Sequence, residues 1–292
     1  MNRMPAYKLL IERIATWARS QEDIRTVLIL GSRARTVDHP ADEWSDLDLT
    51  LFVTDPERFL STSGWVEEIG NPWLTFLEST ADGKGMERRV LFEGGLDVDF
   101  ALFPVASIRK MVETGIPPDA ADTLRHGMEV LMDKDGLMQQ LKVPLSGSQP
   151  PRPPTRSEFL ELVSDFWYHA VWTAKKLRRG ELWTAKFCSD SYMKRQLLRM
   201  VEWHARATND VDCEIWYGGR FLEQWANRRV VEDLRKAFSY YDADDLWRGL
   251  FETMKLFRRL AIETAERLDF AYPTLADEHV AEFVQKIFAE RG

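Results

Sequence analysis

The chain has 292 residues, enough for two domains and for a core that needs neither disulfides nor a structural metal. Its formal net charge of −8 argues against a protein that binds nucleic acid or an anionic membrane, because phosphate contacts need clustered Lys and Arg. A hydrophobic fraction of 45% with 12% aromatic residues excludes a disordered chain, and the two cysteines fit no disulfide framework or zinc pattern. The sequence shows neither a signal peptide nor an apolar run of membrane-spanning length, so we expect a cytoplasmic protein.

The segment 1–143 predicts a mixed β-sheet with a few covering helices. Apolar residues recur at helical spacing from Tyr7 to Trp17, which indicates a first amphipathic helix. Residues 46–53 alternate strictly, with acidic and polar residues on one face and leucines on the other. Strands are expected at 27–30, 46–53, 87–92, 96–103 and 129–132, and the third and fourth form a hairpin around Gly94-Gly95.

A proline-rich segment at 144–154 predicts a linker between two domains. It contains five prolines together with glycine and serine, and it can neither continue a helix nor lie in a central strand. We therefore place the domain boundary there.

The segment 155–292 predicts an all-α helical bundle. Thr155 and Glu158 fit a capping box at the start of a helix that reaches Gly180. Further helices are expected at 181–205, from a cap at Asp244 or Asp245 to residue 268, and at 280–287. Seven of the eleven tryptophans lie in this segment, and we expect most of them in the bundle core.

The segment from Leu28 to Asp48 carries the most specific chemical signal. The expected strand ends at Gly31-Ser32-Arg33, and a polar loop leads to Ser45-Asp46-Leu47-Asp48. Two carboxylates at i and i+2 of a strand project from one face, about 7 Å apart along it. Such a pair is costly unless a cation lies between its members, and Mg²⁺ prefers oxygen ligands and substrate phosphates. Because a Gly-Ser turn lets backbone N–H groups approach phosphate, the pattern predicts a site for a metal-bound nucleoside triphosphate.

A two-metal arrangement needs a third carboxylate. The segment Leu96-Asp97-Val98-Asp99-Phe100 supplies two candidates on one face of a hairpin strand. The spacing alone does not choose between Asp97 and Asp99.

Taken in order, these motifs resemble those of the polymerase-beta-like nucleotidyltransferase superfamily. Further matches over nearly the whole chain look like the aminoglycoside 6-adenylyltransferases, the streptomycin-modifying family; they include Leu30–Arg35, Arg88–Gly94, Val98–Phe100, Asp133–Gly136 and Leu197–Met200. The resemblance implies an N-terminal nucleotidyltransferase domain that binds ATP and Mg²⁺, and a C-terminal helical domain that binds the acceptor. It also implies transfer of AMP from ATP to an aminoglycoside hydroxyl, with release of pyrophosphate.

The resemblance also implies roles for individual residues. Asp46, Asp48 and Asp99 would hold two Mg²⁺ ions, since the family pattern selects Asp99 over Asp97. The nucleotide-binding residues expected from the resemblance and from charge are Gly31, Ser32, Arg33, Arg35 and Lys186.

A general base is expected from the helical domain, where an acid beside aromatic residues can accept the hydroxyl proton. Asp190 is the first candidate, because it matches an Asp of the family, and Glu181 or Glu161 is the second. The alternative is that Asp190 only forms an i±4 ion pair with Lys186 or Lys194 on an exposed helix face.

The expected partners are ATP and a cationic aminoglycoside, which suits the acidic charge, and we expect a monomer that binds neither nucleic acid nor membrane. Two alternatives stay open. One is nucleotidyl transfer to another acceptor, such as a different antibiotic, a metabolite or a protein. The other is a nucleotide-binding sensor without catalytic activity.

Overall fold

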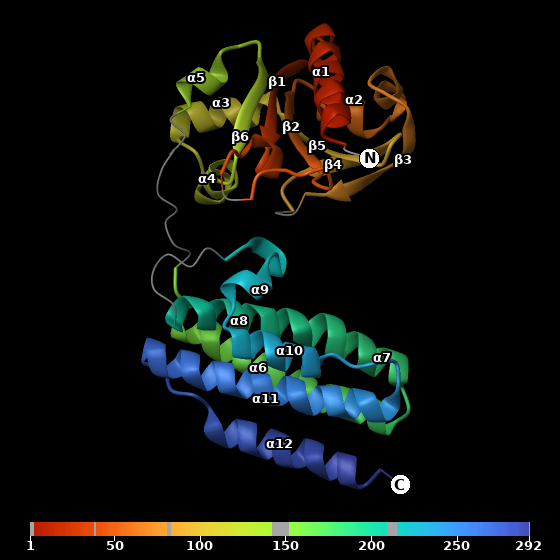
Figure 1. Cartoon of the computed structure of the whole chain (residues 1–292). Helices are drawn as coiled ribbons and strands as arrows, with labels where there is room; N and C mark the ends of the chain where they lie inside the picture. The colour runs from red at the N-terminus through yellow and green to blue at the C-terminus, as the bar shows by residue number, and fades with distance from the viewer. Residues whose placement is uncertain (1–2, 38, 81–82, 142–151, 209–214, 292) are drawn as a thin grey trace. The chain divides into compact units, whose positions relative to one another are not determined.

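The chain folds into two compact units, Met1–Ser148 and Gln149–Gly292 (Figure 1). The computed structural model describes residues 3–37, 39–80, 83–141, 152–208 and 215–291. Residues 144–151 of the predicted linker at 144–154 therefore lie outside the described residues.

The first unit contains a six-stranded mixed sheet in the order β3-β4-β5-β2-β1-β6. The neighbours β2 and β5 are parallel, and the other pairs are antiparallel. The mixed sheet and the hairpin around Gly94-Gly95 agree with the sequence prediction. The strands are β1 (Ile24–Leu30), β2 (Leu47–Val53), β3 (Pro72–Ser79), β4 (Met86–Phe92), β5 (Leu96–Pro104) and β6 (Met128–Asp133).

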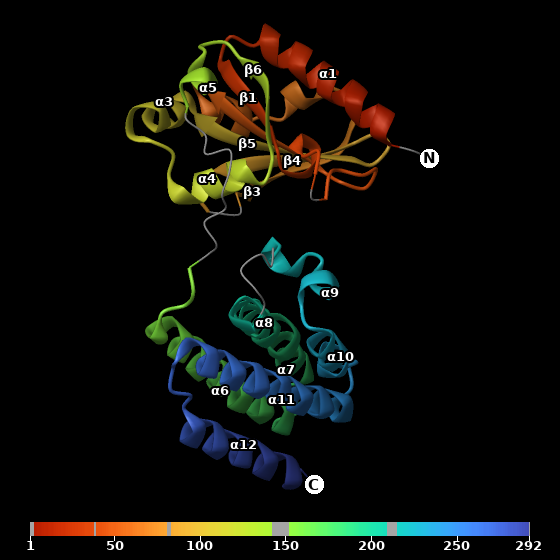
Figure 2. The same cartoon turned by 60° about the vertical axis from the view of Figure 1, so that its left-hand side comes forward.

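Helices cover both faces of this sheet, with α1 on one side and α3 and α5 on the other (Figure 2). The alternation predicted for residues 46–53 is confirmed in β2, where Leu47, Leu49 and Leu51 face the core under α1 and Phe52 faces the core under α3. The side chain of Asp48 therefore projects from the α3 side. The helices are α1 (Met4–Ser20), α2 (Pro56–Leu60), α3 (Val105–Thr114), α4 (Pro118–Arg125) and α5 (Leu137–Gln140), with 3₁₀ turns η1 (Gly31–Ala34) and η2 (Gly64–Glu68).

The edge strand β3 is a feature that the sequence pattern did not indicate. It pairs only with β4, and its large apolar side chains stay exposed on both faces, among them Trp73 and Phe76. Period-2 alternation arises when one face of a strand is buried and the other is wet, so an edge strand exposed on both faces lacks that signal.

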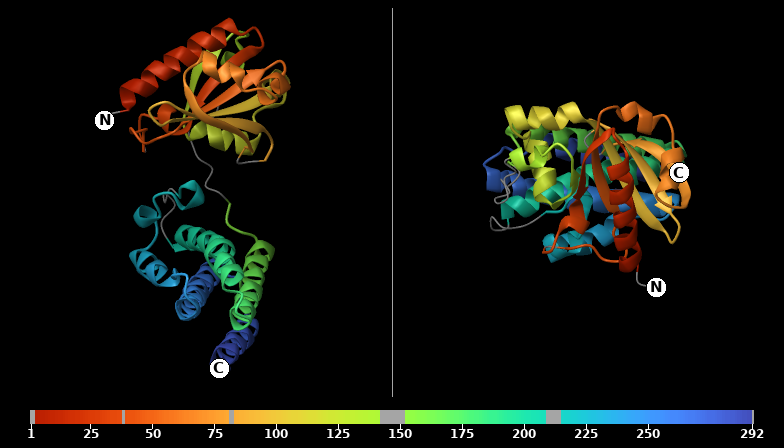
Figure 3. Two further views of the ribbon diagram at one scale, coloured as in Figure 1. Left: turned by 90° about the vertical axis from the view of Figure 1, so that its right-hand side faces the viewer. Right: turned by 90° about the horizontal axis from the view of Figure 1, so that it is seen from above.

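The second unit is the predicted helical bundle, whose long helices run side by side (Figure 3). Thr155 and Glu158 form the expected capping box, and Phe166 of α6 stacks on Phe257 of α11 with ring centroids 3.6 Å apart. Five of the seven tryptophans of this unit are buried, whereas Trp183 is 72% exposed. The helices are α6 (Arg156–Arg178), α7 (Leu182–Phe187), α8 (Lys194–Thr208), α9 (Leu222–Trp225), α10 (Arg228–Ala237), α11 (Ala243–Leu268) and α12 (Thr274–Ala289), with a 3₁₀ turn η4 (Tyr217–Gly219).

The helix predicted at 181–205 is present with one irregularity. The helical path runs from Leu182 to Thr208, but the six residues Cys188–Met193 form a π-helix, η3, between α7 and α8. Such π-turns are rare and occur frequently at functional sites.

The predicted cap of α11 was wrong by two or three residues. The N-cap is Asp242, whose carboxylate accepts a hydrogen bond from the Asp245 backbone N–H at 2.9 Å, whereas Asp244 and Asp245 lie in the first turn. An acidic first turn and an acidic cap look alike in a sequence, because both stabilise the positive end of the helix.

We expect Asp242→Ala to lower the free energy of unfolding by about 1 kcal/mol, because the side chain satisfies a backbone N–H at the start of α11. Urea unfolding followed by circular dichroism measures this change. The control is Asp244→Ala, since Asp244 is 82% exposed in its side chain and forms only a surface ion pair with Arg291. An equal loss in both variants would contradict the cap.

Candidate active site

A glycine turn joins the end of β1 to the acidic strand β2. Gly31 adopts a φ of 68°, and a Cβ on it would lie 2.9 Å from Oδ2 of Asp48. Its backbone N–H donates to the Gly127 carbonyl at 3.0 Å, and a Cβ on Gly127 would lie 2.4 Å from the Gly31 oxygen. Two glycines thus let the backbone and a carboxylate approach closely. Gly127 was not predicted, since an isolated glycine before a strand carries no signal of its partner.

The loop before β2 presents Asp46. Within it the Asp42 carboxylate accepts hydrogen bonds from Trp44 N at 2.8 Å and Ser45 Oγ at 3.0 Å, which closes an Asx-type turn. The Arg33 guanidinium donates to the backbone carbonyls of Asp46 (Nε, 2.8 Å) and Ser45. Asp46 is therefore held through its backbone while its side chain stays available.

Three carboxylates converge at the start of β2 and β5. The parallel pairing of these strands sets Asp48 directly opposite Asp99, and Asp46 lies one residue before β2. Oxygens of Asp46, Asp48 and Asp99 all lie within 4.8 Å of one another. Among the described residues this group includes Asp99 and not Asp97.

Asp99 lies in an environment that disfavours a bare negative charge. The residue is only 6% exposed, and burial is the main cause that raises its pKa to about 7; Arg89 opposes this rise, whereas Asp48 and other nearby acids add to it. Its Oδ1 atom is buried without a hydrogen-bond partner among the described residues. An orphaned carboxylate oxygen beside two further carboxylates fits a hard divalent cation such as Mg²⁺.

Arg89 is a site residue whose role the sequence did not indicate, although it lies in the motif Arg88–Gly94. Its Nη2 lies 3.1 Å from Oδ2 of Asp99, and its Nε lies 2.8 Å from Glu78 and 3.1 Å from Glu87. Register explains the contact, because Arg89 pairs with Asp99 across the β4–β5 hairpin. A local motif cannot reveal such a cross-strand partner.

The residues predicted to bind nucleotide fall into two groups. Gly31, Ser32, Arg33 and Arg35 follow β1, and Arg35 packs against Gly127. Lys186 belongs to the helical unit, where its ammonium donates to the Asp190 carboxylate and to the Ser239 carbonyl at 2.5 Å.

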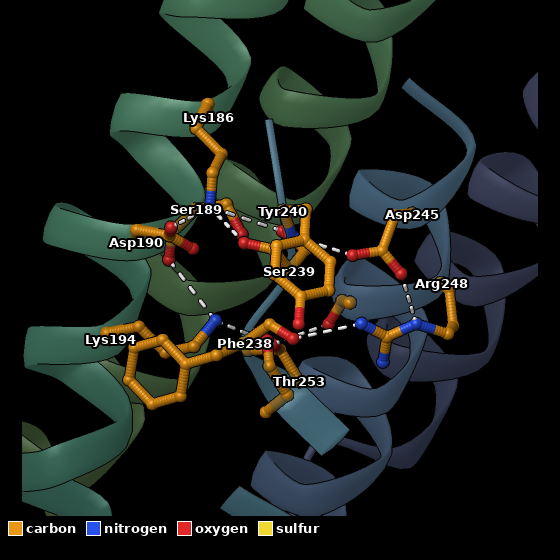
Figure 4. Close-up of polar contacts among 12 residues, drawn as sticks. Lys186, Ser189, Asp190, Lys194, Phe238, Ser239, Tyr240, Asp245, Arg248 and Thr253 are labelled. Atoms are coloured by element: carbon orange, nitrogen blue, oxygen red, sulfur yellow. Dashed lines mark hydrogen bonds and ion pairs between the residues drawn. The ribbon is translucent and has the colours of Figure 1, made fainter. Parts of the chain in front are cut away.

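Asp190 lies in the π-helix η3, beside the loop between α10 and α11 (Figure 4). Its Oδ2 forms the ion pair with Lys186 that was predicted as one alternative. Its Oδ1 is buried and has no hydrogen-bond partner among the described residues. The ion pair therefore leaves one carboxylate oxygen unsatisfied.

Lys194 lies one helical turn further along and is buried. Its ammonium donates to Thr253 Oγ1 at 2.8 Å and to the Ser189 carbonyl at 3.4 Å (Figure 4). Burial lowers its pKa to about 8, although the nearby charge of Asp190 opposes this shift. Lys194 is thus buried and Asp190 is half-buried, so this charged pair of residues does not lie on a fully exposed helix face.

The two other candidate bases are held in local contacts. Glu181 forms ion pairs with Lys176 at 2.6 Å and Arg179 at 2.5 Å. Glu161 accepts a hydrogen bond from Ser157 Oγ at 3.1 Å.

A groove of about 530 Å³ opens beside Asp190 on the helical unit. Aliphatic and aromatic side chains line it, with Leu198, Val201, Leu222, Val231, Leu234 and Phe238 among them. Charged side chains of both signs also line it: Asp190, Glu223, Lys194, Arg195 and Arg235.

Comparison with known proteins assigns the chain to a family. A family model described as streptomycin adenylyltransferase matches residues 4–287. The chain belongs to that family. The membership confirms the resemblance read from the motifs.

Named relatives are distant but cover almost the full length. An aminoglycoside 6-adenylyltransferase of Campylobacter jejuni is 26% identical over 288 residues, 96% of this chain and 95% of the relative. One of Bacillus subtilis (strain 168) is 26% identical over 278 residues, 93% of this chain and 94% of the relative. The crystal structure of an aminoglycoside 6-adenyltransferase from Bacillus subtilis matches at 22% identity with a TM-score of 0.46, covering 96% of this chain and 97% of that one.

Within the described residues, none of the helices combines the length and apolar character that a membrane crossing requires.

We expect the metal-free Asp99→Asn variant to be more stable than the parent at pH 8 and not at pH 4. The folded pKa of about 7 lies above the ordinary value of 3.8, so this group stabilises the fold less as pH rises between those values. At pH 8 the free energy of unfolding of Asp99→Asn should exceed that of the parent by about 2–4 kcal/mol, measured by urea unfolding in EDTA.

Added Mg²⁺ gives the complementary measurement. The parent should gain stability from Mg²⁺ above pH 7, because a ligand that binds only the folded state stabilises it, and the variant should not. If Asp99→Asn changes the free energy of unfolding equally at pH 4 and pH 8, the assigned charge state of Asp99 is contradicted.

Proposed function

We propose that the protein transfers AMP from ATP to a hydroxyl of an aminoglycoside and releases pyrophosphate. The convergence of Asp46, Asp48 and Asp99 carries this proposal, together with membership of the streptomycin adenylyltransferase family. Named relatives of nearly equal length are aminoglycoside 6-adenylyltransferases, which favours position 6 of a streptomycin-like acceptor.

The three aspartates are proposed to hold Mg²⁺, two ions in the complete site. When bound, Mg²⁺ supplies positive charge next to the phosphates. The protein's own contribution is the fixed position of the carboxylates, and Gly31, Ser32 and Arg35 are proposed to bind the triphosphate beside them. Lys186 of the helical unit is also proposed to bind phosphate, since its ammonium carries three N–H groups and the Asp190 carboxylate and the Ser239 carbonyl take two of them.

The reaction proposed is an in-line displacement. The acceptor hydroxyl oxygen forms a bond to the α-phosphorus, the bond from that phosphorus to the pyrophosphate oxygen breaks, and the hydroxyl proton passes to a base. We propose Asp190 as this base and the groove beside it as the acceptor site. Asp190 lines this groove, which supports the assignment, and its Oδ1 has no hydrogen-bond partner among the described residues.

The full-length protein with ATP, Mg²⁺ and a panel of aminoglycosides should release pyrophosphate with at least one member, and mass spectrometry should find that antibiotic adenylylated. Asp46→Asn should lower the rate by about 10³-fold or more, since a metal ligand controls several kcal/mol of transition-state stabilisation. No release with any aminoglycoside would remove this substrate class. No release with any acceptor, combined with tight ATP binding, would indicate a sensor.

Asp190→Asn should lower kcat by about 10²- to 10⁴-fold and leave ATP affinity unchanged, because the amide cannot accept the proton. The matched control is Glu232→Gln, which removes another i,i+4 ion pair of the same unit, with Arg228, outside the groove. The control should keep its full kcat. Full activity in Asp190→Asn would overturn the assignment.

A further inference from the structure

We propose that Arg33 and Tyr7 form an internal clamp that positions Asp46 for metal binding, so that Arg33 is a positioning residue and does not bind the triphosphate. This inference rests on the metal site of the proposed function. It revises the role predicted for Arg33 from its place after the glycine turn.

Each nitrogen of the Arg33 guanidinium has a contact within the protein. Nε donates to the Asp46 carbonyl at 2.8 Å, and Nη2 donates to the Ser45 carbonyl and, at 3.5 Å, to that of Asp42. Nη1 lies 3.8 Å from the sulfur of Met4. A phosphate oxygen that approaches Nε or Nη2 would therefore have to displace a backbone carbonyl.

The aromatic ring of Tyr7 packs against the Arg33 guanidinium. The Arg33 Cζ atom lies 3.4 Å from the centroid of the Tyr7 ring, and Tyr7 is only 3% exposed. The Tyr7 hydroxyl accepts a hydrogen bond from Asp97 N at 3.0 Å. The clamp therefore joins α1, the loop before β2, and the β5 backbone two residues before Asp99.

Asp46 needs such a clamp more than the other two aspartates do. Asp48 and Asp99 lie in the β2–β5 ladder, which fixes their backbones, whereas Asp46 lies just before that ladder begins. A planar guanidinium can hold two successive carbonyls at once, and a lysine ammonium cannot reproduce that fork. The contact acts on the backbone of Asp46 and leaves its carboxylate free for a metal.

The test is Mn²⁺ binding to the full-length protein without ATP, followed by isothermal titration calorimetry. Arg33→Gln and Arg33→Lys should both weaken Mn²⁺ binding by about 10- to 100-fold, the usual effect of losing a residue that orients a ligand. Tyr7→Phe keeps the ring but loses the hydrogen bond with Asp97 N, and it should weaken Mn²⁺ binding less than the Arg33 variants do. ATP affinity measured in EDTA should stay at the parental value in all three variants.

A matched control distinguishes the effect of losing the clamp from the effect of losing any buried arginine. Arg88 is 5% exposed and likewise donates to two backbone carbonyls, those of Phe59 at 3.3 Å and Leu60 at 2.5 Å, away from the carboxylates. Arg88→Gln should leave the Mn²⁺ affinity unchanged at a temperature where the variant is folded.

Two results would overturn the proposal in different ways. If Arg33→Gln binds Mn²⁺ normally but loses ATP affinity in EDTA, and Arg33→Lys restores it, Arg33 is a phosphate ligand and the clamp is wrong. If Asp46→Asn also leaves Mn²⁺ binding unchanged, the metal site of the proposed function fails, and the clamp fails with it.

Discussion

Mutual repulsion among Asp46, Asp48 and Asp99 is the constraint on which the N-terminal unit depends. The parallel register of β2 and β5 forces Asp48 and Asp99 together, and the loop adds Asp46. Burial also disfavours the charged form of Asp99 and is the main cause that raises its pKa. A folded protein tolerates such a group where positive charge can offset it, and Arg89 supplies only part of that charge.

The surroundings of the carboxylates follow from that constraint. Gly31 has no side chain because one would collide with the Asp48 carboxylate, so the glycine turn and the acidic strand lie in direct contact. A turn that favours phosphate and a group that favours a cation thus lie side by side, which is the combination a metal–nucleotide complex needs.

Much of this arrangement follows from the sequence, but only where the signal is local. Alternation in residues 46–53 revealed which face carries Asp48, and Thr155 with Glu158 marked a helix start, because both patterns span a few residues. The parallel pairing that selects Asp99, the contact between Gly31 and Gly127, and the π-helix depend on partners distant in sequence or on packing. The contacts of Arg33 with the Ser45 and Asp46 carbonyls were not predicted for the same reason, since a glycine-rich turn indicates phosphate but not where each side chain points.

In the helical unit, the ion pair with Lys186 bears on the proposed role of Asp190, because a carboxylate paired with lysine is a weaker base than a free one. In Asp190 the pairing involves Oδ2 alone, and the burial of Oδ1 without a partner costs free energy until a donor arrives. Under the proposed function an acceptor hydroxyl is such a donor, and its binding would satisfy the oxygen that is proposed to take the proton. The ammonium of Lys186 would then hold the carboxylate in place, so the observed ion pair is compatible with the proposed role of Asp190 as base.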